Sequence, residues 1–139
     1  LLSLRQGRGH VFGRVRTLAP SAGRSPQALQ DAFRNAATAA DASVACTDGP
    51  FAQLARDGAH WRITALSTPD FGVLRSITVL GARQGDATER VLAELDFPAH
   101  AGAPLQLDER LELPADLRYA RMEVLTRHGR RALTGAGRQ

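Results

Sequence analysis

Few side chains of this sequence have the type and the spacing that catalysis requires. Cys46 is the only cysteine, and His60 is the base that can be paired with it in a nucleophilic site. Neither a helix start nor a Cys-His motif accompanies Cys46, and a lone cysteine is more typical of a small buried apolar side chain. We therefore predict no catalytic residue and a protein that is not an enzyme.

The side chains that bind metals are equally dispersed. The four histidines lie far apart and lack a spacing typical of metal ligands: His10, His60, His100 and His128. The acids Asp108, Glu112 and Asp116 are candidates to hold calcium, since Asp108 and Glu112 point to one side of a strand, but their stretch lacks the Asp-x-Asp-x-Asp-Gly pattern of a calcium loop. We predict solvated histidines, a polar outer face, and neither a metal nor a cofactor.

The sequence Asp70-Phe71-Gly72 spells the magnesium-binding motif of protein kinases. The chain is too short for that fold, and it lacks the glycine loop, the strand lysine and the catalytic loop that give the motif its role. The three residues are predicted to form a turn, in which Asp70 accepts backbone hydrogen bonds and Phe71 packs.

Arginine supplies the basic charge, because all 18 strongly basic residues are arginines and none is lysine. Phosphate contacts of such side chains would be independent of base sequence and sensitive to salt. Aromatic side chains, on which bases stack, make up only 5% of the chain, which argues against a nucleic-acid site. Five arginines near the ends of the chain are the candidate contacts to a partner protein or to phosphates: Arg14, Arg16, Arg127, Arg130 and Arg131.

Charge is sorted into blocks along the chain. Residues 1–40 hold six arginines and one aspartate, residues 86–117 hold eight acids and two arginines, and residues 118–139 hold six arginines and one glutamate. A bipolar particle would stack with copies or partners, basic ends against an acidic face, and gain specificity from the contact. The other interpretation is a solvated surface with its charges facing outward.

One short helix is predicted near the start of the chain. Ser25 has the side chain of an N-cap, and Pro26 is suited to the first helical position. Apolar residues follow at helical spacing in a stripe that is mostly alanine and that favours close packing on a sheet: Leu29, Ala32, Phe33, Ala36, Ala37 and Ala40.

From residue 60 onward the apolar pattern has a period of two, as in strands. Residues 60–80 are predicted to form a hairpin with a long loop, in which the return strand is central and the core holds Trp61, Ile63, Ile77 and Val79. Residues 51–55 are predicted to form a single helical turn. Further strands are predicted at residues 11–18, 44–46, 91–97, 105–113 and 119–124.

These elements predict a mainly β protein with one short α-helix. Its architecture would be a small antiparallel β-sandwich or a partly open barrel with the helix packed on it. The length of 139 residues fits one domain, which we place at residues 1–126 and follow with a flexible basic tail at residues 127–139.

A β-rich frame with charge blocks and without a catalytic constellation favours a non-enzymatic structural or adaptor subunit of a larger assembly. Sandwich adaptors with one helix are frequent in phage-type virion particles and cell-envelope machines, an analogy of architecture alone. Its partners would be other protein subunits, copies of itself included. The alternatives are a nucleic-acid-associated basic domain and a small-molecule-binding or hydrolytic domain near His60, Asp70 and His100. No apolar run approaches the roughly 18 residues of a membrane-spanning helix.

Overall fold

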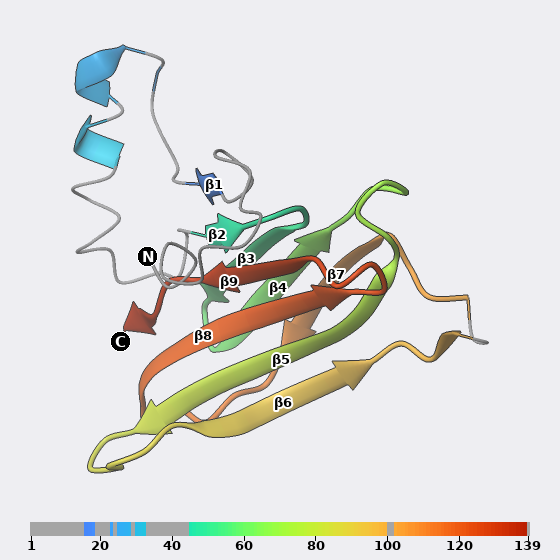
Figure 1. Ribbon diagram of the computed structural model, residues 1–139. Helices are drawn as coiled ribbons and strands as arrows, with labels where there is room; N and C mark the ends of the chain where they lie inside the picture. Colours follow the sequence, from blue (N-terminus) through green and yellow to red (C-terminus); the bar gives the residue numbers. More distant parts are fainter. Residues whose placement is uncertain are drawn as a thin grey trace.

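Two antiparallel sheets facing each other form the protein, and they do not close into a barrel (Figure 1). The computed structural model describes residues 16–18, 23, 25–28, 30–32, 45–99 and 102–138. Within these ranges, strands account for 55% of the structure and one short helix is present. The predicted mainly β sandwich with one short helix is therefore confirmed.

The larger sheet runs in the order β1-β2-β9-β8-β5-β6, and β10 pairs with β8 beside this path. Every pairing in it is antiparallel. Strand β5 has a partner on each side, so the prediction of a central strand is confirmed. The strands of this sheet are β1 (Arg16–Leu18), β2 (Ala45–Thr47), β5 (Leu74–Arg83), β6 (Arg90–Asp96), β8 (Leu117–Thr126), β9 (Arg131–Thr134) and β10 (Gly137–Arg138).

The smaller sheet has the order β3-β4-β7, with β3 at Phe51–Asp57, β4 at His60–Leu66 and β7 at Gln106–Leu111. The prediction of a helical turn at residues 51–55 was wrong. Buried Ala52 and Leu54 alternate with more exposed neighbours, and β3 pairs with β4 over its whole length. Gly58, at a φ of 62°, allows the tight turn between the two strands.

The predicted hairpin at residues 60–80 was also wrong. Strand β4 pairs with β3 and β7, whereas β5 lies in the other sheet. The connection between β4 and β5 therefore crosses from one sheet to the other. Each of the two strands does bury one face, and these faces meet across the core between the sheets. The alternation of apolar residues shows that a strand has a buried face, but it does not show in which sheet the strand lies.

The core lies between the inner faces of the two sheets. The predicted core residues Trp61, Ile63, Ile77 and Val79 are at most 3% exposed, which confirms them. Leu74, predicted on the opposite face from Ile77, is fully buried as well. A register shift between Leu74 and Ser76 in the pairing with β8 changes the side on which the strand places its side chains.

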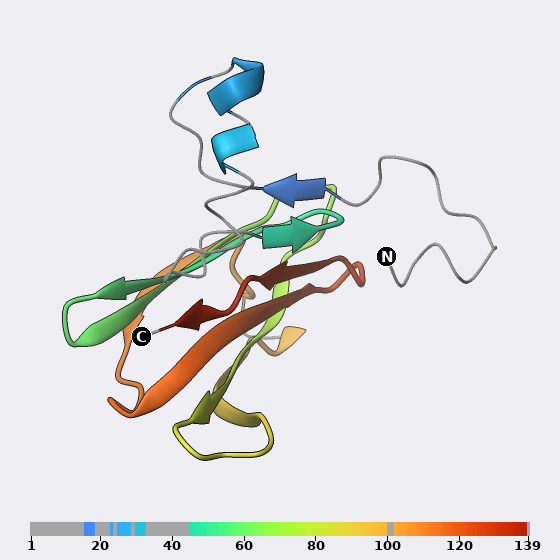
Figure 2. The same cartoon turned by 90° about the vertical axis from the view of Figure 1, so that its left-hand side faces the viewer.

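The helix includes residues 26–28 and 30–32. The Ser25 hydroxyl accepts a hydrogen bond from the Ala28 N–H at 3.1 Å, so the predicted cap is confirmed. Ala32, from the predicted apolar stripe, is buried. Figure 2 shows this helix beside the β1 end of the larger sheet. The other residues of the stripe lie outside the described ranges.

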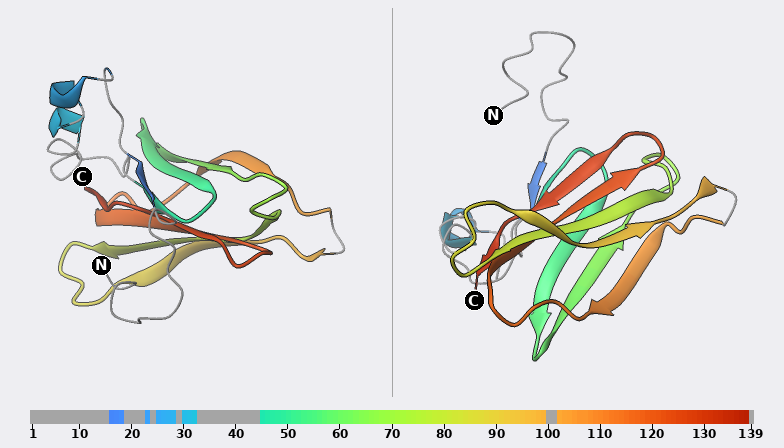
Figure 3. Two further views of the ribbon diagram at one scale, coloured as in Figure 1. Left: turned by 45° about the horizontal axis from the view of Figure 1, so that its top comes forward. Right: turned by 90° about the horizontal axis from the view of Figure 1, so that it is seen from below.

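The C-terminal stretch predicted to be a flexible tail is instead part of the larger sheet. Strand β9 lies between β8 and β2, and Gly137 and Arg138 pair with β8 (Figure 3). Ala132 and Thr134 of β9 are buried, and the Thr134 hydroxyl accepts a hydrogen bond from the Met122 N–H at 2.8 Å. A strand of four residues is too short to show its period against a basic, glycine-rich background.

The two sheets approach each other most closely along one side, where β3 lies near β2, β8 and β9. Strands β6 and β7 are the last strands of their sheets on the other side (Figure 3). Each of them pairs with a single neighbour among the described strands, so each presents a free edge.

Candidate functional site

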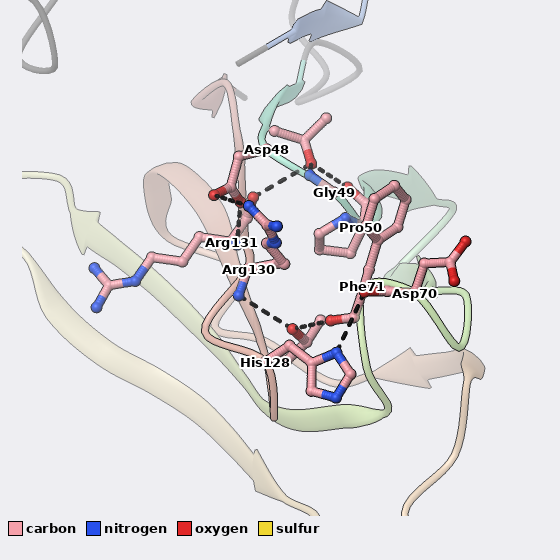
Figure 4. Close-up of polar contacts among 10 residues, drawn as sticks. Asp48, Gly49, Pro50, Asp70, Phe71, His128, Arg130 and Arg131 are labelled. Atoms are coloured by element: carbon pink, nitrogen blue, oxygen red, sulfur yellow. Dashed lines mark hydrogen bonds and ion pairs between the residues drawn. The ribbon is translucent and has the colours of Figure 1, made fainter. Parts of the chain in front are cut away.

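Three of the five predicted contact arginines lie in one turn. Arg127 and Arg130 lie in the connection from β8 to β9, and Arg131 is the first residue of β9. This connection meets the β2–β3 turn and the β4–β5 connection at one end of the sandwich (Figure 4). We call this meeting point of three loops the loop cluster. Arg16 is the first residue of β1, in a different part of the larger sheet, and Arg14 lies outside the described residues.

Short polar contacts fix the loop cluster. The Asp48 carboxylate accepts a hydrogen bond from the Arg131 N–H at 2.6 Å and lies 3.8 Å from the Arg130 guanidinium. The buried Thr126 hydroxyl donates to the Phe71 carbonyl at 2.6 Å and accepts from the Arg130 N–H at 3.1 Å. These bonds join all three loops, so the cluster holds this end of the sandwich together.

Gly72 allows the β4–β5 connection to pack closely against His128. Its φ is +85°, and a Cβ at this position would lie 2.7 Å from the ring of His128. Nδ1 of the same ring lies 3.2 Å from the Asp70 carbonyl oxygen. Phe71 packs against Gly49, as predicted. For Asp70, the backbone carbonyl makes the described contact, and its carboxylate accepts no backbone hydrogen bond from the described residues.

The three arginines of this turn have different acceptors. The Arg127 guanidinium donates to the Phe97 carbonyl, and that of Arg130 is paired with Asp48. The Arg131 guanidinium is 4.0 Å from Glu123, and Figure 4 shows it pointing away from His128. The structure therefore brings these residues into one turn without bringing their charges together on one ligand.

The residues considered for catalysis are not brought together. His60 begins β4 and Asp70 follows the end of this strand, so about 20 Å of extended chain separates them. Cys46 is exposed on β2. Strand β3 begins shortly after it and ends at the turn before His60, so the length of β3 separates Cys46 from His60. His100 lies outside the described residues.

The three acids considered for calcium each have a different basic side chain as partner. Asp108 forms two hydrogen bonds with Arg62, at 2.7 and 2.5 Å, Glu112 lies 3.7 Å from His60, and Asp116 lies 3.5 Å from Arg83. The Arg62 hydrogen bonds hold the pKa of Asp108 below its ordinary value. Within the described ranges, no group of three or more potential ligands could hold a metal ion.

The acidic block of residues 86–117 contains the two edge strands on this side of the sandwich. It includes β6 of the larger sheet and β7 of the smaller one, which we call together the acidic side. The acids before β6 are paired: Glu89 binds Arg121 at 2.7 Å, and Asp86 binds Arg90 at 2.9 Å. The pKa of Asp86 is lowered, first by its hydrogen bond from the Arg83 N–H and then by Arg90.

The acids at the end of β6 differ from those before it. Glu94 and Asp96 lie opposite Thr78 and Ser76 of β5, on the outer side of the sheet, and no hydrogen bond or ion pair involves their carboxylates within the described part of the chain. Strand β6 also leaves Val91 54% exposed. Sequence analysis predicted this half-buried strand but missed its place at an edge, because alternation does not reveal which strands lack a neighbour.

The edge of β7 is protected in a way that the edge of β6 is not. Glu109 lies opposite Ile63, on the inward side of β7, between the partly buried Leu107 and Leu111. An inward charge on an edge strand hinders the addition of another strand. On the outer side, the Arg110 guanidinium is bound to Asp57 at 2.9 Å. Because β6 carries no inward charge between Ala93 and Asp96, it is the more accessible of these two edges.

Comparisons with known proteins add little. No protein-family model and no curated protein matches the chain. Among solved structures it is similar to the hypothetical protein PH1083 from Pyrococcus horikoshii OT3, with a TM-score of 0.44 and 9% identity over 65% of this chain and 88% of that one. This likeness is too distant to carry an argument. Within the described ranges, no helix has the length and hydropathy needed to cross a bilayer.

Proposed function

We propose that this protein is a non-enzymatic structural or adaptor subunit of a larger protein assembly, acting through protein–protein contacts on its acidic side. The observation that carries the proposal is the accessible edge of β6, on which Glu94 and Asp96 lack partners among the described residues. A virion particle or a cell-envelope machine is the kind of assembly in which such a subunit would serve.

Free sheet edges support this proposal because they carry rows of unpaired N–H and C=O groups. Proteins usually blunt such edges or cover them with another element, and partners use the remaining ones for strand addition. The edge of β7 has an inward charge, whereas β6 has regular alternation from Ala93 to Asp96. Acids concentrated here would add specificity and a fast approach of a basic partner.

The nucleic-acid alternative has weaker support. Counterion release requires several cations positioned on a phosphate backbone, and Arg127, Arg130 and Arg131 each bind a separate acceptor. Filter binding of the full chain to single- and double-stranded nucleic acid over a salt series tests this alternative. Binding at low salt that falls steeply with added salt would favour it over the proposed function.

The proposed function is tested by sedimentation velocity at rising concentration, together with cross-linking of the full chain in an extract of its own host. We expect either self-association or a stoichiometric protein partner, with cross-links mapping to residues 86–117. A strictly monomeric chain without any cross-linked partner would contradict it. Cross-links confined to the loop cluster would contradict the placement on the acidic side.

A further inference from the structure

We propose that the edge of β6 binds an extended segment of a partner protein in which basic and apolar side chains alternate, and that this segment joins the larger sheet as an additional strand. The inference rests on the proposed function, since it states the chemistry of the partner that the acidic side would recognise.

The outer side of β6 specifies the basic half of the pattern. Glu94 and Asp96 are two residues apart on the same side of the strand, a distance of about 7 Å. An added strand with arginine or lysine at every second position would place one cation beside each carboxylate. Opposite charges on neighbouring strands stabilise their pairing.

The inner side specifies the apolar half. Ala93 and Leu95 lie on the inward side of β6, opposite Val79 and Ile77, and Phe97 follows them. All three are only partly buried although they pack against the core, as are the apolar side chains on and beside β7 in the facing sheet: Leu107, Leu111 and Leu113. Apolar side chains on the inward side of an added strand would extend the core between the two edges.

Pairing of β6 with β6 of a second copy is opposed by the same acids. In an antiparallel pair, directly opposite residues lie on the same face of the sheet. In the register centred on Leu95, Glu94 of each copy would meet Asp96 of the other, and in a register centred on Glu94 or Asp96 that acid would meet its own counterpart. Like charges in opposite positions are destabilising. The acids on β6 thus disfavour pairing with β6 of a second copy and favour pairing with a basic strand.

The test uses the full chain and three short synthetic peptides. The first alternates arginine and valine, the second has the same composition with the arginines in one block, and the third alternates glutamate and valine. We expect the first to bind at low salt at least tenfold more tightly than the other two, measured by calorimetry, with affinity falling as salt rises. Equal binding of the first two peptides would overturn the proposal.

Two matched variants locate the site. Glu94→Arg with Asp96→Arg should weaken binding of the alternating peptide about tenfold or more, because two attractive cross-strand pairs become repulsive. Glu109→Arg with Glu112→Arg makes the same change in net charge on β7 and beside it, and should change the affinity less than about twofold. Equal loss in both variants would overturn the proposal.

Further readouts separate folding and self-association from recognition. Glu94→Gln with Asp96→Asn keeps the side-chain size, and should weaken peptide binding while leaving the circular dichroism spectrum unchanged. Self-association of the wild-type chain that Arg14→Glu with Arg16→Glu abolishes would assign the edge to a second copy and overturn the proposal. If the peptides fail while a host protein cross-links to residues 86–117, this inference fails and the proposed function stands.

Discussion

At the scale of single residues, the loop cluster depends on two kinds of position: a glycine whose backbone angle and close neighbours disfavour any side chain, and hydroxyl or carboxylate groups that join loops. Gly72 has a positive φ, and the ring of His128 occupies the space that a side chain would need. Gly85 has the same φ of 85° with no atom within 4 Å of a Cβ added there. Substituting alanine at both glycines therefore separates two effects: backbone strain is common to both positions, whereas steric conflict with a neighbour arises only at Gly72.

Gly72→Ala should lower the free energy of unfolding by about 2–5 kcal/mol, because positive-φ strain adds to overpacking against His128. Gly85→Ala should cost only the backbone part, about 1–2 kcal/mol. Urea denaturation measures both. Adding His128→Ala to the Gly72 variant should restore part of the loss; a double variant no more stable than Gly72→Ala would refute the steric explanation.

Asp108 predicts how stability depends on pH. Its pKa in the folded protein is lowered by Arg62, so the carboxylate stabilises the fold above its ordinary pKa, and this contribution disappears as pH falls through the lowered value. Urea midpoints measured between pH 6 and pH 2 should show Asp108→Asn less stable than wild type near neutrality, with the difference vanishing at the acid end.

Asp96→Asn is the control for this titration, because it removes a carboxylate that has no partner among the described residues. It should lower stability less than Asp108→Asn at pH 6. A deficit of Asp108→Asn that stays constant down to pH 2 would show that Asp108 acts through packing and not through its charge.

At the scale of elements, sequence periodicity predicted most strands but little of their pairing. The period of two marked β4, β5, β6, β7 and β8, and hydrophobic alternation placed Trp61 and Ile77 in the core. It did not predict that β4 and β5 lie in different sheets, since an amphipathic strand needs an apolar surface to cover and many arrangements supply one. The role of Arg130 and Arg131 as partner contacts stays a prediction, and their acceptors come from distant segments that the sequence does not reveal.

Strand β9 carries the element-scale prediction. A chain ending after Arg130 loses the strand between β8 and β2, together with buried Ala132 and Thr134. We expect a loss of at least roughly 3 kcal/mol or of the cooperative thermal transition. A chain ending after Ala136 lacks only β10 and should stay close to wild type by circular dichroism. Equal stability of both chains would restore the idea of a dispensable tail.

At the scale of the whole molecule, the two sheets are held together by a shared core and by β3 lying near β2, β8 and β9. Trp61, the only tryptophan, is 3% exposed on the smaller sheet, while most strand residues belong to the larger one. Tryptophan fluorescence therefore reports on the smaller sheet and the shared core, whereas far-ultraviolet circular dichroism is dominated by the larger sheet.

The two signals should follow a single urea transition with the same midpoint, because neither sheet buries its inner face alone. Leu54→Ala, in the smaller sheet, should lower the free energy of unfolding by about 2–5 kcal/mol and should move both urea midpoints down together. Leu66→Ala removes a side chain that is 43% exposed and should have a much smaller effect. An earlier fluorescence transition would mean that the smaller sheet unfolds on its own.

The pairing of β2 with β9 has a consequence for how the chain folds as it is made. The register joins Cys46 to Leu133, so β2 cannot acquire this neighbour until the chain has been synthesised through β9, more than 80 residues later. The β3–β4 hairpin closes locally through Gly58 and is free to form early. The high contact order of the larger sheet therefore makes its completion the slow, aggregation-exposed step of folding.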